Sequence, residues 1–147
     1  MAIYFYSITE EYGCFSNFSR HGFELNSQYW PTSEHYFQAQ KFADTPHEEL
    51  IRKAFSPMEA AKMGRDRKRP LRKDWEQVKD EIMVIAVRKK FEIHKDIRDI
   101  LLSTGEEELV EHTTDDYYWG CGTEKTGKNM LGKILMKVRE EFRNSGI

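Results

Sequence analysis

The spacing of apolar residues predicts two long helices in the second half of the chain. The first begins at Asp74 and ends between Phe91 and His94. Its buried stripe consists of Trp75, Val78, Ile82, Ile85 and Ala86 and ends at the charged Lys89. The second begins near Asn129 and closes the core with Met130, Leu131, Ile134, Leu135, Val138 and Phe142. A shorter helix between them is expected to stop at Gly105, because glycine commonly ends a helix.

Three shorter helices are predicted between residues 32 and 64. Helix-start residues precede the first, and no Gly or Pro interrupts residues 32–42. The other two open with a hydroxyl, a proline and a glutamate in capping-box positions, at residues 45–48 and 56–59. We expect them to end near Phe55 and near Gly64, a residue suited to the left-handed conformation at a helix end.

Short β-branched and aromatic runs predict four strands, at residues 3–6, 23–26, 28–30 and 109–112. Residues 115–127 have the Gly and polar content of a loop. The predicted fold class is therefore α+β, a mostly helical protein with a small β-sheet.

The helix predicted at residues 32–42 combines the marks of a buried helix with charged residues. Glu34 and Lys41 are seven residues apart, which places them within about 20° of the same azimuth and ~10 Å apart along the axis. Helical side chains lean towards the N-terminus, so Lys41 reaches back over Gln38 towards Glu34. The two head groups could flank one small ligand, although a solvated polar stripe would show the same spacing.

Composition restricts the class of protein. A chain of 147 residues with 13% aromatic and 33% charged residues suits one compact domain, which we expect to span residues 1–147. The net charge of −2 gives no general attraction to nucleic acid or to a membrane. The sequence contains no apolar membrane span and no signal peptide, so we expect a cytoplasmic protein. Cys14 and Cys121 are the only cysteines and are expected to be reduced thiols.

Local clusters offer candidate binding residues. Residues 65–73 include six basic residues, which either hold a phosphate through forked arginine contacts or form a solvated loop. Asn17 lies in an aromatic and polar loop, where it either binds a ligand or turns the backbone. The nucleotide, metalloprotease and hydrolase motifs GxGxxG, GxxxxGK[ST], HExxH and GxSxG are absent, and no metal ligands or cofactor are expected.

Several longer motifs, in order along nearly the whole chain, resemble those of the NADAR, or YbiA-like, family. The motifs are Phe15-Ser16-Asn17-Phe18, Trp30-Pro31-Thr32-Ser33-Glu34-His35-Tyr36-Phe37-Gln38-Ala39-Gln40-Lys41-Phe42, Gly64-Arg65, Arg72-Lys73-Asp74-Trp75, Lys90-Phe91, Asp116-Tyr117-Tyr118-Trp119-Gly120-Cys121-Gly122 and Gly127-Lys128-Asn129-Met130-Leu131-Gly132-Lys133-Ile134-Leu135-Met136. The resemblance implies a compact, mostly helical α+β domain and a hydrolase of N-glycosyl bonds.

The resemblance also implies which residues form the site. Glu34 and Lys41 fall on the family's EHYFQAQKF-type signature, and Asp116 falls on its D-x-x-W-G motif. These three are the predicted catalytic residues. The predicted substrate-binding residues are Asn17, Tyr36, Arg65, Trp75, Trp119, Gly120 and Asn129, the last on a G-x-N-x-L-G motif.

Cleavage of a bond between C1′ of a ribose and a nitrogen needs a group that assists the departing nitrogen and one that stabilises or captures the sugar carbon. Glu34 is the candidate acid or base. Lys41 either forms a Schiff base with the open-chain ribose, if burial lowers the pKa of its amine, or stays charged and holds a hydroxyl or phosphate. Trp119 is expected to stack on the base and the Arg65 region to bind phosphate.

The expected function is hydrolysis of a phosphorylated ribosylamine of the riboflavin-pathway type, or of ADP-ribosylated guanine. The alternative is a non-catalytic module that binds ADP-ribose or NAD. We expect a phosphorylated ribosyl or ADP-ribosyl substrate, with ADP-ribosylated nucleic acid as a further candidate partner, no membrane partner, and a monomeric protein.

Overall fold

The computed structural model describes residues 1–146, and contacts within the chain divide it into two compact units. Residues 20–90 form the central unit. Residues 1–19 and the chain from Phe91 onward form the terminal unit. The expectation of a single domain over residues 1–147 stays a prediction.

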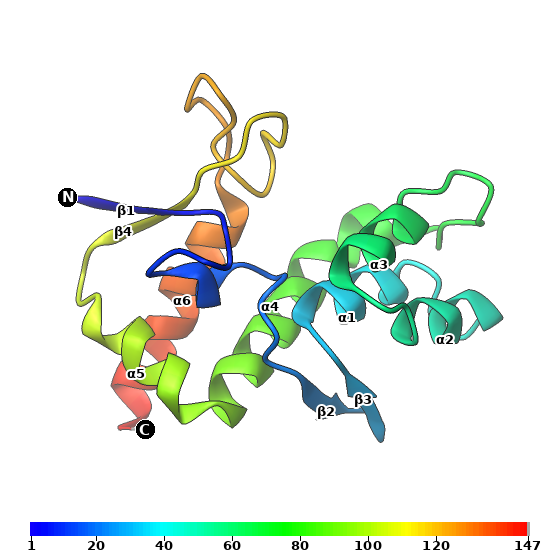
Figure 1. Ribbon diagram of the computed structural model, residues 1–147, viewed down its shortest axis with the longest axis horizontal. Coiled ribbons are helices and arrows are strands. Elements are labelled where there is room, and N and C mark those ends of the chain that lie inside the picture. Colours follow the sequence, from blue (N-terminus) through cyan, green and yellow to red (C-terminus); the bar gives the residue numbers. More distant parts are fainter. Residues whose placement is uncertain (147) are drawn as a thin grey trace. The chain divides into compact units, whose positions relative to one another are not determined.

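The central unit contains a hairpin and most of the helices (Figure 1). Strands β2 (Phe23–Leu25) and β3 (Gln28–Trp30) are antiparallel, with Phe23 opposite Trp30. Asn26 and Ser27 join them with φ values of 56° and 65°, as a tight hairpin turn requires. The helices are α1 (Ser33–Gln40), α2 (Pro46–Arg52), α3 (Pro57–Gly64) and α4 (Trp75–Ile93), of which α4 continues into the terminal unit.

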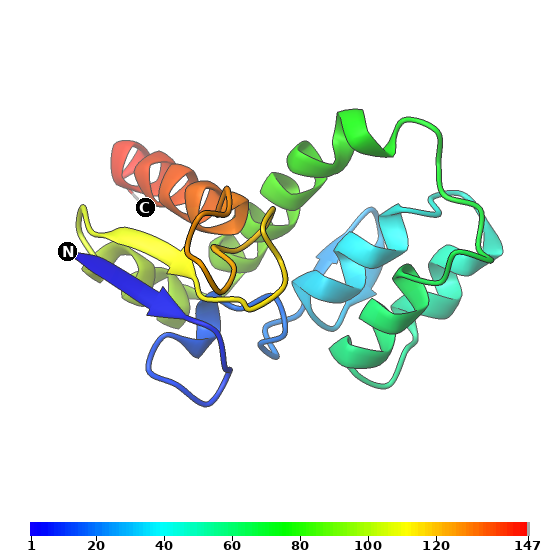
Figure 2. The same ribbon diagram turned by 90° about the horizontal axis from the view of Figure 1, so that it is seen from above.

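The terminal unit brings the N-terminal strand together with the last third of the chain (Figure 2). Strands β1 (Ala2–Phe5) and β4 (Glu108–Glu111) are parallel, with Ala2 opposite Glu108, and α6 (Met130–Ser145) packs on β4. A short 3₁₀ helix, η1 (Gly13–Phe15), and α5 (Lys95–Ser103) complete the unit. The predicted α+β class is confirmed, but the strands form two separate pairs in place of one small sheet.

The helices α1, α2 and α3 begin where the sequence predicts. The hydroxyls of Thr32, Thr45 and Ser56 each accept a hydrogen bond from a backbone N–H of the following turn. The predicted end of α2 near Phe55 is wrong, because α2 ends at Arg52. Ser56 has the extended backbone of an N-cap before Pro57, so the chain must leave the helix before it.

His35 fastens α1 to the turn between α2 and α3. Its side chain is buried, with Nε2 3.0 Å from the carbonyl oxygen of Ala54 and Nδ1 2.8 Å from the hydroxyl of Thr32. A carbonyl only accepts, so Nε2 carries the proton and Nδ1 accepts from the hydroxyl. Burial lowers the pKa of His35, because the charged imidazolium would lose its hydration, while the bond to Ala54 opposes this shift. His35 is therefore neutral in the folded protein at neutral pH.

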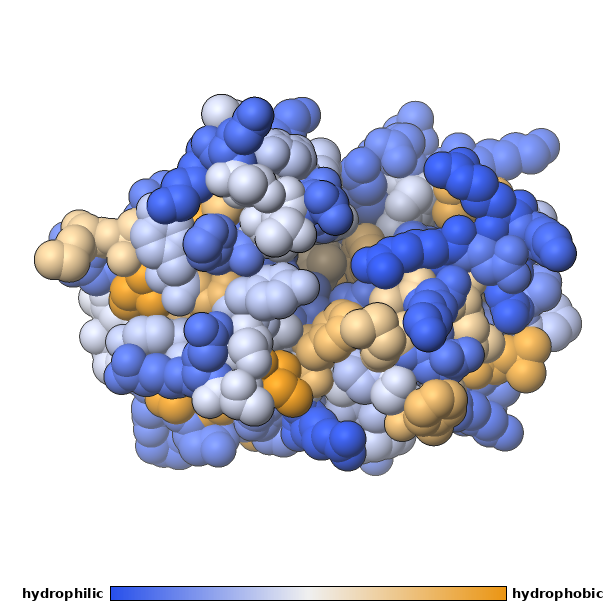
Figure 3. Space-filling model, turned by 45° about the horizontal axis from the view of Figure 1, so that its top comes forward, coloured by the Kyte–Doolittle hydropathy of each residue, from blue (hydrophilic) through white to orange (hydrophobic). Residues whose placement is uncertain are grey.

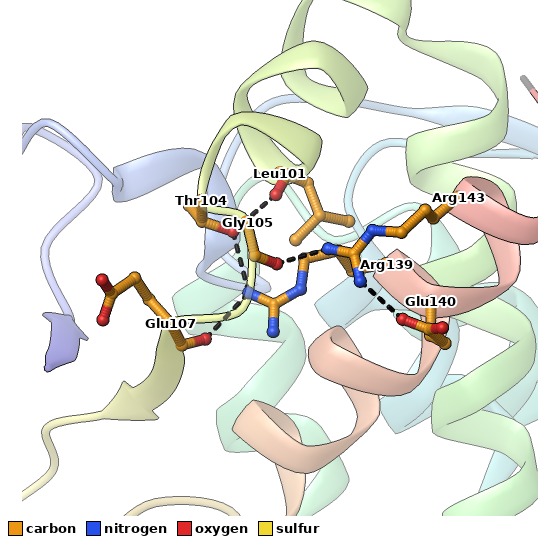
Figure 4. Close-up of polar contacts among 7 residues, drawn as sticks. All are labelled: Leu101, Thr104, Gly105, Glu107, Arg139, Glu140 and Arg143. Carbon is orange, nitrogen blue, oxygen red and sulfur yellow. Dashed lines mark hydrogen bonds and ion pairs between the residues drawn. The ribbon is translucent and has the colours of Figure 1, made fainter.

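A buried arginine holds α6 against the turn that leads into β4 (Figure 4). Arg139 is 5% exposed, and its Nη1 donates to the hydroxyl of Thr104 at 2.9 Å and to the carbonyl oxygen of Glu107 at 2.8 Å. One turn further on, Arg143 donates to the carbonyl oxygen of Gly105 and pairs with Glu140. The two hydrogen bonds of Arg139, to Thr104 and Glu107, offset the free-energy cost of burying its charge.

The face drawn in Figure 3 is mostly hydrophilic, with apolar residues in small groups. Exposed apolar residues include Tyr29, Leu50 and Phe55 in the central unit and Tyr6 and Ile8 in the terminal unit. Isolated apolar residues of this kind are usual on soluble domains.

Candidate active site

Lys41 lies at the end of α1, between two aromatic rings and the end of α3. Its Nζ donates a hydrogen bond to the carbonyl oxygen of Gly64 at 3.3 Å. The same atom is 5.9 Å from the ring centroid of Phe37 and 5.8 Å from that of Trp75, and these two rings pack against each other at 5.1 Å. The amine is thus held by packing and by one backbone acceptor.

Several groups around Lys41 act on the pKa of its amine. Burial lowers the pKa of Lys41; the carboxylate of Glu34 raises it, and the positive charges of Arg65 and Lys79 lower it. A lowered pKa increases the fraction of amine with a free lone pair at neutral pH, which is the nucleophilic form. Lys79 was missed in the sequence, although it follows Trp75 by one helical turn and so lies on the same face of α4.

Glu34 lies in the first turn of α1 and is 7% exposed, so the alternative of a solvated stripe is wrong for this residue. Its Oε2 accepts a hydrogen bond from Nε2 of Gln38 at 2.7 Å. Its charge also acts on Lys41, as expected for two residues on one helix face. A carboxylate and an amine of lowered pKa are therefore brought together on one side of α1.

Gly64 serves the site in a way that the sequence did not indicate. The prediction of a left-handed Gly64 is wrong, because its φ is not positive and Arg65 continues in the helical region. A Cβ on Gly64 would lie 1.9 Å from Oε1 of Gln38. Glycine is thus needed here because α1 and α3 approach closely.

Tyr36 lies on the other side of α1, since two residues correspond to a turn of about 200°. Its ring contacts those of Trp30 and Phe23 at 5.1 and 6.2 Å. Burial and the charge of Glu48 raise the pKa of Tyr36, and the charge of Arg72 opposes them. The structure does not bring this predicted binding residue together with Lys41.

A polar hollow of about 500 Å³ lies on that second side of α1. The residues that line it are Asn26, Gln28, Trp30, Gln40, Ala43, Asp44, Glu48, Glu49, Arg52 and Arg72. Arg52 is paired with Glu49 and Arg72 with Asp74. Since both guanidinium groups already have carboxylate partners, the hollow is a poor site for a phosphate.

The basic stretch at residues 65–73 is partly bound to the protein. Arg69 contacts Nδ1 of His47 at 2.7 Å and pairs with Asp66, and Arg72 donates to the carbonyl oxygen of Gln40 at 3.2 Å. Arg65 is exposed and has no ion-pair partner within residues 1–146. Arg65 therefore combines freedom to bind an anion with proximity to Lys41.

The remaining predicted site residues lie in the terminal unit. Asp116 accepts hydrogen bonds at Oδ1 from the backbone N–H groups of Tyr118 and Trp119, at 3.0 and 2.8 Å. This turn presents Trp119, which is half-buried and packs edge-on against Tyr118. Asn17 is buried in the turn after η1. Their roles in catalysis and binding stay predictions.

Gly120 and Asn129 contribute to the packing of this loop on β4. A Cβ on Gly120 would lie 2.4 Å from the side chain of Thr113. Asn129 has a φ of 53°, donates from Nδ2 to the carbonyl oxygen of Leu109 at 2.9 Å and accepts at Oδ1 from the N–H of Glu111 at 3.0 Å. The amide of Asn129 thus extends the hydrogen bonding of β4, a role in stability that the sequence did not predict.

Two further features of residues 1–146 concern metal binding and membrane insertion. No group of three or more His, Cys, Asp or Glu side chains could hold a metal ion there. None of the helices in this part of the chain has the length and apolar character needed to cross a membrane.

The chain belongs to the NADAR family, whose NADAR domain matches residues 4–143. The fold agrees: the NMR structure of the Escherichia coli protein YbiA matches with a TM-score of 0.91 and 52% identity, over 99% of this chain and 86% of that chain. The predicted family is thereby confirmed.

Relatives that span nearly the whole chain are named as N-glycosidases. The N-glycosidase Npun_R5314 of Nostoc punctiforme is 55% identical over 147 residues, covering 98% of this chain and 94% of the relative. The N-glycosidase YbiA of E. coli is 54% identical over 140 residues, covering 95% and 88%. The predicted enzyme class, a hydrolase acting on N-glycosyl bonds, is confirmed by these relatives.

A longer relative is named for a pathway. The riboflavin biosynthesis protein VVA0006 of Vibrio vulnificus is 40% identical over 141 residues, which cover 96% of this chain and 38% of that protein. The matching region is therefore one part of a larger protein in that organism.

Proposed function

We propose that this protein hydrolyses the bond between C1′ of a phosphorylated ribose and an amine nitrogen, using Glu34 and Lys41. The observation that carries the proposal is the lowered pKa of Lys41 on the side of α1 that also holds the buried carboxylate of Glu34. A neutral lysine is a nucleophile towards carbonyl and imine carbons, and a nearby carboxylate can move the protons that the reaction requires.

The proposed reaction begins with the open-chain ribose, whose C1′ is joined to the leaving amine as an imine. The lone pair of Lys41 Nζ forms a bond to C1′, while the π electron pair of the imine moves onto the leaving nitrogen. Two protons leave Nζ and pass through the carboxylate of Glu34 to the leaving nitrogen, whose bond to C1′ then breaks. C1′ and Nζ are left as a Schiff base. Water adds to C1′, its two protons return to Nζ, the bond between C1′ and Nζ breaks as the C=O bond forms, and the ribose departs as an aldehyde.

The charges around Lys41 support a phosphorylated substrate. Arg65 and Lys79 both act on the Lys41 amine, and Lys79 is already paired with Glu76 at 2.7 Å. Arg65 has a forked guanidinium suited to two phosphate oxygens. We therefore assign Arg65 to the substrate phosphate.

Two substrate classes fit this chemistry. A phosphorylated ribosylamine is favoured by the name of the V. vulnificus relative, which refers to riboflavin biosynthesis. ADP-ribosylated guanine offers the same linkage between ribose and nitrogen, with a larger phosphate group. The local cluster of basic residues, in a chain of net charge −2, favours a small phosphate ligand over long nucleic acid.

The test is an assay of sugar release with matched substrates. A phosphorylated ribosylamine, its dephosphorylated form and an ADP-ribosylated guanine nucleotide are incubated with the purified protein, and ribose phosphate, ribose and ADP-ribose are measured. Release from a phosphorylated substrate, reduced when the phosphate is removed, is the expected result. Binding of ADP-ribose without release from any of the three would contradict the proposal and support a non-catalytic module.

A further inference from the structure

The two polar atoms of the Gln38 amide have different surroundings. Gln38 is 4% exposed, and its Nε2 donates to Glu34 Oε2 at 2.7 Å. Its Oε1 is buried and has no hydrogen-bond partner within residues 1–146. A buried acceptor without a partner is destabilising, so this arrangement calls for an explanation.

The surroundings allow the amide no other fixed partner. Oε1 faces Gly64, where the missing Cβ leaves room for it. The carbonyl oxygen of Gly64 accepts from Lys41. Among residues 1–146, Glu34 alone forms a hydrogen bond with the Gln38 amide, so the charge on Glu34 decides which amide atom faces it.

An ionised carboxylate only accepts, so it selects Nε2, whereas a protonated carboxyl donates its O–H and selects Oε1. We propose that Gln38 is a positioning residue that holds Glu34 as an anion in the free protein and turns its amide by half a rotation to accept from Glu34 when that carboxyl takes up a proton. The unpartnered oxygen is the acceptor that the second state uses.

This inference rests on the proposed function, in which Glu34 starts as a carboxylate, takes a proton from Lys41 and passes it on. A donor that stabilises the anion sets the starting state, and an acceptor that holds the protonated carboxyl keeps it in place during the transfer. Gln38 does not touch the reacting atoms in this scheme. It acts through Glu34.

The decisive variant is Gln38→Met, which keeps the length of the side chain and removes both amide atoms. The titration of Glu34 is followed by NMR of its labelled carboxyl carbon, with Glu34→Gln used to assign the signal. We expect the titration of Glu34, and with it the acid limb of kcat/KM, to move up by about one pH unit, as expected for losing a hydrogen bond to a charged group.

The matched control is Gln40→Met. Gln40 lies on the same helix, is also buried, and donates from Nε2 to Glu48 Oε2 at 2.9 Å, on the side of α1 away from Glu34. This variant should leave the titration of Glu34 within about 0.2 units. An equal shift in both variants would show a general effect of helix stability and would overturn the role of Gln38.

A measurement on the unaltered protein covers the case in which Gln38→Met does not fold. The side-chain amide signals of Gln38 should change with pH at the same midpoint as the Glu34 carboxyl carbon. Amide signals that stay constant through that midpoint would overturn the inference. Neither NMR titration depends on turnover, so they still decide the role of Gln38 if Glu34→Gln proves active and the proposed function fails.

Discussion

Lys41 and Gly64 are joined by a hydrogen bond of 3.3 Å, from the amine at the end of α1 to the carbonyl oxygen at the end of α3. A neutral amine keeps N–H groups that can donate, so the bond persists when Lys41 loses its charge. The lone pair then points away from the carbonyl oxygen. The carbonyl oxygen of Gly64 thus orients the Lys41 amine and leaves its lone pair available for attack.

The covalent role of Lys41 predicts a trapped intermediate. Borohydride added during turnover should reduce the Schiff base to a secondary amine, which cannot hydrolyse, and mass spectrometry should find a sugar-derived mass on Lys41 alone. Lys41→Arg should lower turnover by at least about a hundredfold, since a guanidinium stays protonated. An active Lys41→Arg variant without an adduct would contradict the covalent step and leave Lys41 as an electrostatic contact.

Glu34→Gln should lower turnover by about a hundredfold or more while substrate affinity stays within about tenfold. The new amide oxygen still accepts from Gln38 Nε2, so the side chain keeps its position while losing its ability to move protons. Single-turnover kinetics and a binding measurement separate the two quantities. Glu48→Gln is the control, because it alters a carboxylate that is also bound to a glutamine of α1. Full turnover in a folded Glu34→Gln would remove Glu34 from the mechanism.

Trp119→Ala should weaken substrate binding by about 1–3 kcal/mol if the indole stacks on the base. Calorimetry with a non-hydrolysable analogue measures the affinity, and a melting curve measures stability. Trp119→Phe keeps an aromatic face and should recover part of the affinity. Lower stability with unchanged affinity would instead identify Trp119 as a packing residue against Tyr118.

Gly64→Ala should destabilise the fold by about 1–3 kcal/mol, because the new methyl group meets the Gln38 amide. Urea denaturation gives the free energy of unfolding. The same change made in a Gln38→Ala background should cost less, since the contacts with Oε1 and Cδ of Gln38 at 1.9 and 2.7 Å are removed and the contact with its Cβ at 2.9 Å remains. Equal costs in both backgrounds would mean that Gly64 is needed for another reason.

Stability should fall as the pH drops below about 6.5. The pKa of His35 is lowered in the folded state, so its contribution is fully present above the unfolded value of 6.5 and is lost as the pH falls towards the folded value. The slope is at most ~1.4 kcal/mol per pH unit for one proton. Urea titrations at several pH values should give a flatter curve for His35→Gln.

Local signals made the helices predictable. Thr32, Thr45 and Ser56 mark helix starts through their own hydroxyls, and seven-residue spacing was enough to place Glu34 and Lys41 on one face. The pairing of β1 with β4 could not be predicted, since nothing in either strand specifies a partner more than a hundred residues away. The sequence also did not connect Lys79 or Gly64 with Lys41, because each of these residues lies on a different helix from Lys41.

The pairing of β1 with β4 also determines the order in which the chain can fold. Residue 2 meets residue 108, so β1 must wait until the intervening residues have been made before it finds its partner. Residues 20–90 are continuous in sequence and have their contacts available much earlier. We therefore expect the half of the protein that carries Glu34 and Lys41 to acquire structure during synthesis, while Tyr4 and its neighbours stay unpaired until the end.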